Sequence, residues 1–288
     1  MQPVAPVPGL VIPYGNKSYH IGQPIGRGYF GSVYECWDDW NNELVAKVLL
    51  PNTVQSPEVQ RASWLDELHK LVTLRHPRIT YLYDAFEFQG SFYLIIERCS
   101  STLASIISAV GDQPSPVAMG KLLIPYIARD VLQALYYMHS AGYVHKDIHA
   151  GNVFIKHERD TMVPDKEPVW SFKVGDLGIS RLVGDINVFN TMLAPWMLPP
   201  EHLNPNEFGI VGTQTDIYHV ALLLLQVLLG TTRLQFSHEQ IVAGHPGQLA
   251  GSLESRYGPI LARALRRHVH ARTPDALTFW REIDAANR

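Results

Sequence analysis

The sequence predicts an α+β protein of two lobes, with a small strand-rich N-terminal lobe that carries one key helix and a larger, mainly helical C-terminal lobe. Two observations lead to this prediction. Residues 19–97 are rich in short β-branched and aromatic runs between turn residues. Residues 98–288 show mostly helical spacing of apolar side chains. A cleft between two lobes is a preferred place for a ligand.

The first 18 residues are expected to form an extended tail, because four prolines occur in the first 13. The segments SVYECW and ELVAKVLL then predict two strands. Helical spacing predicts a helix between Glu58 and Arg75, which ends at His76-Pro77. The segments ITYLYDAF and SFYLIIE predict a strand pair around Gln89-Gly90.

The second part begins its regular structure with a long helix, predicted from Val117 to Ser140. Short strands are expected around Tyr143-Val144, Val153–Ile155 and Phe172–Val174. The apolar run Val220–Leu229 is half the length of a membrane span, so it predicts a buried core helix.

Composition narrows the function classes. Hydrophobic residues make up 46% of the chain and charged residues 18%, which fits a globular protein. A net charge of -3 gives no basic field, so neither nucleic acid nor an anionic membrane is an implied partner. Cys36 and Cys99 have neither metal-ligand spacing nor the density of a disulfide scaffold. With no signal peptide or membrane anchor expected, the sequence predicts a cytoplasmic protein; it carries no signal for the oligomeric state.

The segment IGRGYFGSV contains three glycines, Gly26, Gly28 and Gly31, in a G-x-G-x-x-G pattern. Glycine lets the backbone approach a phosphate closely. A dinucleotide fold would need a helix after this loop, but a predicted strand follows. The pattern therefore favours a glycine-rich flap over nucleotide phosphates.

A lysine and a glutamate form the next candidate pair. Lys47 lies between apolar neighbours in a predicted strand, and Glu67 lies 20 residues later in the predicted helix. Such a pair can hold the α- and β-phosphates of a nucleotide. Asp66 is a neighbouring acid, so the choice of Glu67 depends on its spacing of nine residues before His76.

The strongest chemical signal is the segment YVHKDIHAGNVFI, followed by KVGDLG. Asp147 could orient a substrate hydroxyl and accept its proton. Asn152 could ligate a metal, and Asp176 adds a second carboxylate at a strand end. Magnesium that bridges phosphates needs one or two carboxylates of this kind.

These segments together resemble the eukaryotic-type protein kinase superfamily over about residues 19–280. The matching pieces are IGRGYFGSV, VAK, Glu67 with HPRI, HKDIHAGN, GDLG, PPE at 199–201 and TDIYHVALLLL. The resemblance implies a two-lobed protein kinase fold, ATP and Mg²⁺ as cofactors, and transfer of the γ-phosphoryl group to hydroxyls of a protein substrate, with serine or threonine as the expected acceptor.

The resemblance also assigns roles to single residues. It implies an ion pair from Lys47 to Glu67, Asp147 as catalytic base, and Asn152 and Asp176 as metal ligands. It makes Ile96 the residue that guards the adenine pocket. The remaining expected positions are the hinge from Glu97 to Cys99, the side chains that sandwich adenine at Val33, Ala46 and Phe154, Asp216 as the brace of the catalytic loop, and Arg272 as the partner of Glu201.

Four positions depart from the common kinase pattern. Lys146 replaces an arginine, and a lysine is a point charge without the planar fork that suits phosphate. Leu177 replaces a phenylalanine and keeps an apolar side chain. His149 stands where these kinases carry a lysine that contacts the transferred phosphate, and we expect it to be catalytic. Ala194 stands where they carry a threonine, so the choice of acceptor stays open.

Regulation by phosphorylation is expected at Thr191, between GDLG and PPE, with Lys146 and Arg181 as partners of the phosphate.

Two other functions stay open. The pattern Asp147-x-His149-x-x-Asn152 also resembles the loop of aminoglycoside and choline phosphotransferases, although the PPE segment, Asp216 and Arg272 resemble protein kinases. A pseudokinase that acts as a binding scaffold is the other alternative.

Overall fold

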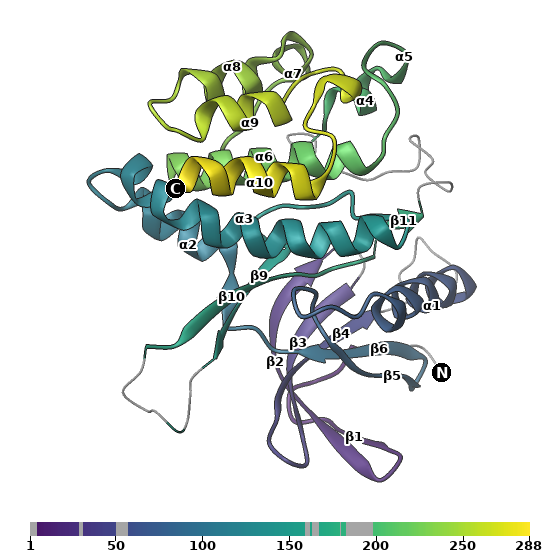
Figure 1. Cartoon of the computed structure of the whole chain (residues 1–288). Helices are drawn as coiled ribbons and strands as arrows, with labels where there is room; N and C mark the ends of the chain where they lie inside the picture. The colour runs from purple at the N-terminus through teal and green to yellow at the C-terminus, as the bar shows by residue number, and fades with distance from the viewer. Residues whose placement is uncertain are drawn as a thin grey trace. The chain divides into compact units, whose positions relative to one another are not determined.

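The computed structural model describes residues 5–28, 31–49, 57–158, 162, 167–178, 180–182 and 198–288. The chain divides into two compact units, the N-terminal unit Met1–Arg98 and the C-terminal unit Cys99–Arg288. The N-terminal unit carries a six-stranded sheet and the helix α1, and the C-terminal unit is mainly helical (Figure 1). The predicted α+β fold class with two lobes is confirmed.

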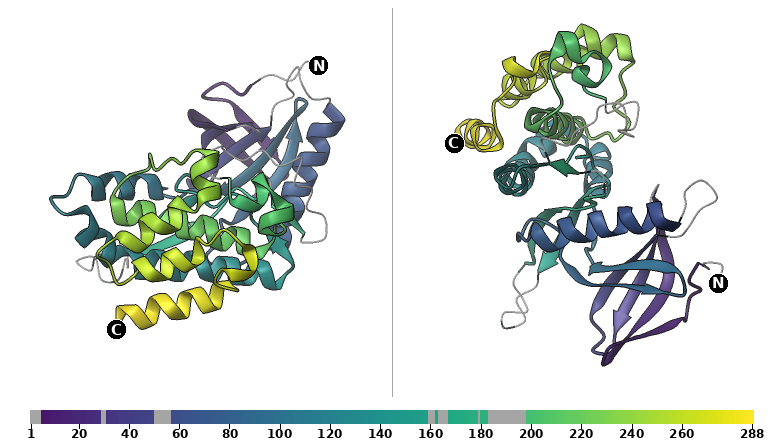
Figure 2. Two further views of the ribbon diagram at one scale, coloured as in Figure 1. Left: turned by 90° about the horizontal axis from the view of Figure 1, so that it is seen from above. Right: turned by 90° about the vertical axis from the view of Figure 1, so that its right-hand side faces the viewer.

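The sheet of the N-terminal unit has the strand order β1-β2-β3-β4-β6-β5, and all of its neighbours are antiparallel. Its elements are β1 Val11–Tyr14, β2 Lys17–Gly28, β3 Gly31–Asp38, β4 Glu43–Leu49, α1 Pro57–Thr73, β5 Leu82–Phe88 and β6 Ser91–Glu97. The helix α1 interrupts the run of strands in the sequence, and it lies alongside the sheet (Figure 2).

The strand β1 lies in the segment expected to be an extended tail. It is extended, and it also pairs with β2, where Val11 faces His20 and Tyr14 faces Lys17. Ile12 is fully buried in the core of this unit. The residues before β2 therefore add a strand to the sheet.

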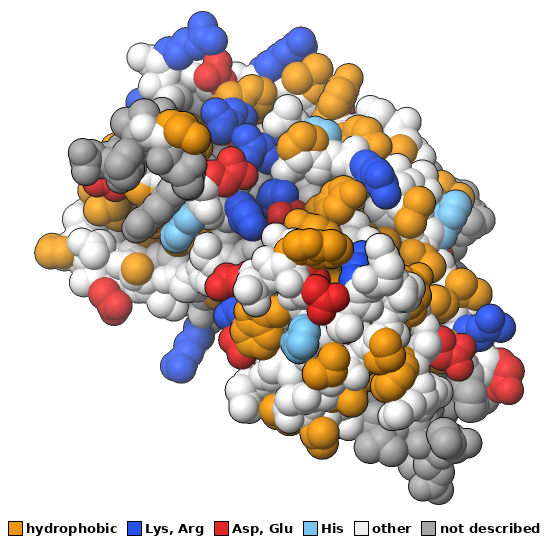
Figure 3. Space-filling model, turned by 90° about the horizontal axis from the view of Figure 1, so that it is seen from below, with side chains coloured by type: hydrophobic (Ala, Val, Ile, Leu, Met, Phe, Trp, Pro, Cys, Tyr) orange, Lys and Arg blue, Asp and Glu red, His pale blue; other side chains and the backbone are white. Residues whose placement is uncertain are grey.

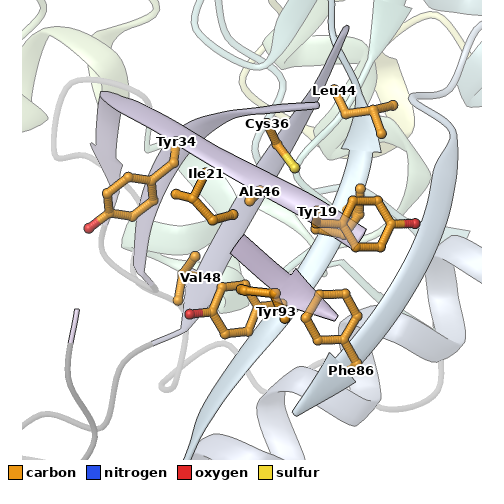
Figure 4. Packing of buried hydrophobic residues seen from close by; sticks show 11 residues of the cluster. Tyr19, Ile21, Tyr34, Cys36, Leu44, Ala46, Val48, Phe86 and Tyr93 are labelled. Atoms are coloured by element: carbon orange, nitrogen blue, oxygen red, sulfur yellow. The ribbon is translucent and has the colours of Figure 1, made fainter. Parts of the chain in front are cut away.

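Aromatic rings form part of the core beneath the sheet (Figure 4). The ring of Phe86 stacks on Tyr93 at 5.2 Å and on Tyr19 at 5.6 Å between centroids. Stacked pairs of this kind stabilise a core beyond the area that they bury. The Tyr19 hydroxyl donates a hydrogen bond to Asp84, and Lys17 forms an ion pair with the same carboxylate, so the polar end of this ring is satisfied.

The C-terminal unit is built around α6, whose residues from Thr215 to Leu228 are all buried. The predicted core helix over Val220–Leu229 thus lies inside this element. The elements of the unit are β7 Ser101–Thr102, α2 Leu103–Gly111, α3 Pro116–Ser140, β8 Tyr143–Val144, β9 Val153–Glu158, β10 Val169–Val174, β11 Arg181–Leu182, α4 Pro200–Leu203, α5 Pro205–Phe208, α6 Thr213–Leu229, α7 His238–Ala243, α8 His245–Ser252, α9 Gly258–Ala264, the 3-10 helix Val269–Ala271 and α10 Ala276–Asn287.

Two small sheets position the loops of this unit. The strands β9 and β10 are antiparallel, and their pairing runs from Val153 opposite Val174 to Glu158 opposite Val169. Both strands are therefore longer than the sequence predicts. β7 pairs with β9, and β11 pairs with β8. The helix α3 packs against α6 and α10 (Figure 1), and it also packs against β10.

Among the described helices, none combines the length and the apolar character needed to cross a membrane. Figure 3 shows Lys and Arg side chains mixed with Asp and Glu on the face that it displays. That mixture agrees with the small net charge of -3.

Candidate active site

Lys47 and Glu67 form an ion pair in the N-terminal unit. The Nζ atom of Lys47, on β4, lies 2.7 Å from Oε1 of Glu67, on α1. The side chains are 11% and 3% exposed, so the pair is largely out of water. The structure therefore brings together the two residues that the spacing singled out.

Trp64 sets the position of Glu67, because it attaches α1 to the sheet one turn earlier. Its indole Nε1 donates to the carbonyl of Tyr93 at 3.1 Å, and its ring stacks on Phe92 at 5.3 Å. Residues three apart on a helix share a face. The face that packs on β6 through Trp64 therefore also directs Glu67 towards β4.

The start of β3 requires glycine at position 31. A Cβ atom placed there would lie 2.2 Å from the carbonyl oxygen of Val48 on the neighbouring strand. Gly31 also pairs with Gly28, where β2 ends and β3 begins. Gly26 pairs with Val33, and a Cβ there would make only an ordinary contact. The glycine pattern thus serves a close approach between backbones at Gly31.

Some of the positions expected around adenine belong to the N-terminal unit and the others to the C-terminal unit. In the N-terminal unit, Val33 pairs with Lys47, Ala46 is fully buried, and Ile96 pairs with Val45. The carboxylate of Glu97 accepts the backbone N–H of Tyr81 at 2.8 Å. In the C-terminal unit, Phe154 on β9 pairs with Thr102, and Cys99 is partly buried. Their roles stay a prediction.

Asp147 and Asn152 are joined by two hydrogen bonds in the C-terminal unit. The Nδ2 group of Asn152 donates to Oδ2 of Asp147 at 2.9 Å and to its backbone carbonyl at 3.0 Å. The loop over residues 145–152, called the catalytic loop below, is therefore closed on itself, and the carboxylate of Asp147 has a fixed orientation.

Asp216, at the start of α6, holds the beginning of this loop by its backbone. Its carboxylate accepts the N–H of His145 at 2.8 Å and the N–H of Lys146 at 2.7 Å. The imidazole of His139, at the end of α3, lies 2.8 Å from the same carboxylate. Lys146 has φ +74°, a conformation that costs about 1–2 kcal/mol for a non-glycine residue. Hydrogen bonds to a charged carboxylate are strong enough to offset that cost.

His145 connects the catalytic loop to the GDLG segment. Its fully buried ring accepts the N–H of Asp147 at Nδ1, at 3.2 Å, and faces the carbonyl of Gly175 with Nε2, at 3.1 Å. Asp176 follows with φ +59°, and Leu177 behind it is fully buried. This ring thus contacts the peptide group that precedes each of the two aspartates.

The electrostatics of the loop keep its carboxylates ionised. Burial alone would raise the pKa of Asp147, but the contact with the imidazole of His149 outweighs it and lowers this pKa below its ordinary value. Burial opposes ionisation of Asp216 as well, and its bonds with His139 and the loop amides still hold its pKa low. Burial lowers the pKa of His145, which favours the neutral ring.

Asn152 and Asp176 offer oxygen ligands that fit magnesium. Because the amide nitrogen of Asn152 is used on Asp147, its Oδ1 atom remains available as an acceptor. Asp176 supplies a carboxylate, and Mg²⁺ prefers such hard oxygen donors. The residues present therefore fit the cation that the sequence predicts.

The profile of the protein kinase domain matches residues 19–254 of this chain, which is most of its length. The chain belongs to the protein kinase domain family. The predicted membership of the eukaryotic-type protein kinase superfamily is confirmed, and the roles of the single residues stay predictions.

Several serine/threonine kinases are similar to this kinase domain. PLK2 of Mus musculus is 28% identical over 227 residues, which cover 77% of this chain and 30% of that protein. The probable kinase PknB of Bifidobacterium longum is 24% identical over 285 residues, 92% of this chain and 39% of that protein. TOUSLED of Arabidopsis thaliana is 27% identical over 246 residues, which cover 79% of this chain and 33% of that protein. The chain thus spans about a third of the length of these relatives.

Glu201 and Arg272 form the other predicted pair, and both lie in the C-terminal unit. The guanidinium contacts both carboxylate oxygens, at 2.7 and 2.5 Å, and neither side chain is exposed. Arg272 also lies over the ring of Tyr218, 4.7 Å from its centroid. The hydroxyl of Thr215 donates to Glu201 at 2.8 Å. Burial would raise the pKa of Glu201, and the bonds from Arg272 hold it low.

Two predicted positions, Thr191 and Ala194, lie outside the described residues. Of the expected partners of a phosphate on Thr191, Lys146 is 4% exposed, and Arg181 donates to the carbonyl of Ser180 at 2.8 Å.

The sequence analysis missed three residues that shape the site: His139, His145 and Gly151. His145 was visible as the first residue of HKD, and Gly151 as the residue two after His149. His139 had no signal of its own, because its partner Asp216 is 77 residues away.

Proposed function

We propose that this kinase domain is an active enzyme that transfers the γ-phosphoryl group of ATP to a serine or threonine hydroxyl of a protein substrate. The observation that carries the proposal is the bond from Asn152 to Oδ2 of Asp147, on a loop that Asp216 holds by its backbone. A catalytic base needs a fixed orientation and an ionised carboxylate, and Asp147 has both.

The step is an in-line displacement. The hydroxyl oxygen of the substrate bonds to the γ-phosphorus, and the bond from that phosphorus to the β,γ-bridging oxygen breaks, which leaves its electron pair on ADP. The hydroxyl proton passes to the carboxylate of Asp147. The protein positions these groups and stabilises charge rather than forming a covalent intermediate.

On the nucleotide side, Lys47 would contact the α- and β-phosphates, with Glu67 as its positioning partner. Magnesium, when bound, supplies neutralisation of the phosphate charge, and Asn152 and Asp176 would hold it.

A pseudokinase scaffold and a small-molecule phosphotransferase are less well supported. Pseudokinases usually lack one of the reactive residues, and this chain carries Lys47, Asp147, Asn152 and Asp176. The buried pair of Glu201 and Arg272 belongs to the features that resemble protein kinases. The similar proteins are named as serine/threonine kinases, which supports the same acceptor here.

The regulatory and cellular expectations also stay proposals. We propose that phosphorylation of Thr191 raises activity, and mass spectrometry of active protein, together with Thr191→Ala, tests this. We also propose a cytoplasmic location, which fits a protein with only two cysteines in its sequence and a need for ATP; cell fractionation tests it.

The test of the main proposal is transfer from γ-labelled ATP with Mg²⁺ to a general acceptor such as casein and to the chain itself. We expect labelled phosphoserine or phosphothreonine from the wild type, none from Asp147→Asn, and wild-type transfer from Asp112→Asn, a control at an exposed acid. Equal transfer by Asp147→Asn would contradict the proposal, and nucleotide binding without any transfer by the wild type would favour the scaffold.

A further inference from the structure

The two ring nitrogens of His149 have different surroundings. Its Nδ1 atom accepts the backbone N–H of Gly151 at 2.9 Å, and its Nε2 atom lies 3.7 Å from Oδ2 of Asp147. A neutral imidazole carries one proton, and the nitrogen that accepts a hydrogen bond cannot carry it. The contact with Gly151 therefore places the proton on Nε2, the nitrogen that faces Asp147.

Gly151 leaves room for this ring. A Cβ atom at position 151 would lie 2.8 Å from Cε1 of His149 and 3.1 Å from its Nδ1. Gly151 is not among the described glycines with positive φ, so its backbone conformation does not require glycine. The need for glycine at this position comes from the imidazole.

The two carboxylate oxygens of Asp147 are not equivalent. Oδ2 accepts the amide N–H of Asn152, and it is also the oxygen that His149 faces. Oδ1 accepts no hydrogen bond within the described part of the chain. The acceptor hydroxyl can therefore reach Oδ1 without displacing a protein donor.

We propose that His149 is a positioning residue whose Nε2–H group, oriented by the amide of Gly151, holds Oδ2 of Asp147, so that Oδ1 is the oxygen that takes the hydroxyl proton. This rests on the proposed function. The distance of 3.7 Å is longer than a hydrogen bond, and catalytic hydrogen bonds often shorten only when substrate is bound. As the hydroxyl oxygen bonds to the γ-phosphorus and ADP leaves, the proton moves to Oδ1.

This role differs from that of a lysine at the same position. A lysine ammonium is a point charge that can contact the transferred phosphate. An imidazole attached to Gly151 on one side and directed at Asp147 on the other acts on the base. Its loss should therefore lower kcat and leave KM for ATP unchanged.

A matched pair of substitutions separates positioning from a role in loop structure alone. The amide of His149→Gln can place a donor where Nε2 lies, whereas the side-chain oxygen of His149→Asn can only replace the acceptor Nδ1. We expect kcat of His149→Gln within about threefold of wild type and kcat of His149→Asn lower by about tenfold, with KM for ATP unchanged in both. His238→Gln and His238→Asn, at an exposed histidine, are the controls.

Gly151→Ala tests the position of the His149 imidazole by crowding the ring rather than by replacing it. Gly151→Ala should push the imidazole away and lower kcat about tenfold in the wild type, but it should cost little further when added to His149→Ala, which has no ring. Equal losses in both backgrounds overturn the coupling between these two positions.

Nuclear magnetic resonance can show directly which ring nitrogen of His149 carries the proton. In ¹⁵N-histidine-labelled protein, with the signal assigned by its loss in His149→Gln, we expect the proton on Nε2. A proton on Nδ1, or kcat of His149→Asn equal to or above that of His149→Gln in variants with wild-type melting temperatures, overturns the inference alone. A wild type that shows no transfer overturns the proposed function and this inference with it.

Discussion

The guanidinium of Arg272 and the carboxylate of Glu201 contact each other at two points, and neither side chain is exposed to solvent. Glu201 lies on α4 and Arg272 follows the 3-10 helix Val269–Ala271, 71 residues later. The pair therefore fixes the end of one segment to another that is distant in sequence.

Breaking this pair should destabilise the C-terminal unit strongly. Removing one partner of a buried ion pair leaves an uncompensated charge, so Arg272→Met should lower the free energy of unfolding by about 3–5 kcal/mol. The double variant Arg272→Met, Glu201→Leu should recover part of that loss, because no charge is left unpaired. Urea unfolding measures both; a single variant as stable as the wild type would contradict the buried pairing.

The ion pair of the N-terminal unit should matter for activity. Lys47→Met removes a preorganised positive donor, so kcat/KM should fall by at least about 100-fold. Glu67→Gln should cost less, because Glu67 acts through Lys47. Glu43→Gln, at the exposed start of β4, is the control. A larger loss for Glu67→Gln than for Lys47→Met would reverse these assigned roles.

Asp176 allows the metal role to be separated from the fold. Its φ of +59° lies in a region that asparagine tolerates well and alanine does not. Asp176→Asn should therefore abolish transfer at every Mg²⁺ concentration with an unchanged melting temperature. Asp176→Ala should lose transfer and about 1 kcal/mol of stability. Normal transfer by Asp176→Asn would remove Asp176 from the metal site.

His202 predicts a pH dependence of stability. Both of its ring nitrogens are buried without a hydrogen-bond partner in the described structure, and burial, with smaller effects of nearby charges, lowers its pKa from 6.5 to about 4. Its neighbours include His219, Glu201, Lys146 and Arg272. Between pH 6.5 and about 4, the unfolded chain binds a proton at this residue that the folded chain does not bind. Stability should therefore fall as the pH falls through this window, by up to about 3 kcal/mol.

The test is His202→Leu, which replaces the ring by an apolar side chain. This variant should be as stable as the wild type or more stable at pH 8, because it removes unsatisfied buried nitrogens. It should also lose stability less steeply between pH 6.5 and 4, as measured by urea unfolding at each pH. His238→Leu, at an exposed position, is the control. An unchanged slope in His202→Leu would assign the acid sensitivity to other groups.

Local patterns predicted the helices α1, α3 and α6 and several of the strands. The long helix was expected from Val117 and begins at Pro116, and the strand pair around Gln89-Gly90 has its turn there. The strand β1 was not predicted, because a proline-rich composition describes an extended backbone but not the partner with which it pairs. The two-residue strand β7 was too short to have a period.

The contacts of the candidate site also divide into those that local spacing predicts and those that depend on packing between distant segments. The spacing from Lys47 to Glu67 was readable, because a strand and the helix after it are neighbours in both sequence and space. The contact of His139 with Asp216 was not readable, because it depends on the packing of α3 beside α6. Which nitrogen of His149 faces Asp147 depends on a backbone amide, which no residue type reveals.

Asp216 contacts the catalytic loop through the amides of positions 145 and 146, and every residue except proline supplies such an amide. The two contacts that hold the chain before Asp147 are therefore the same whether position 146 carries arginine or lysine. The regulatory role expected at position 146 and the placement of the base would thus depend on different groups, a side chain for the first and two backbone amides for the second.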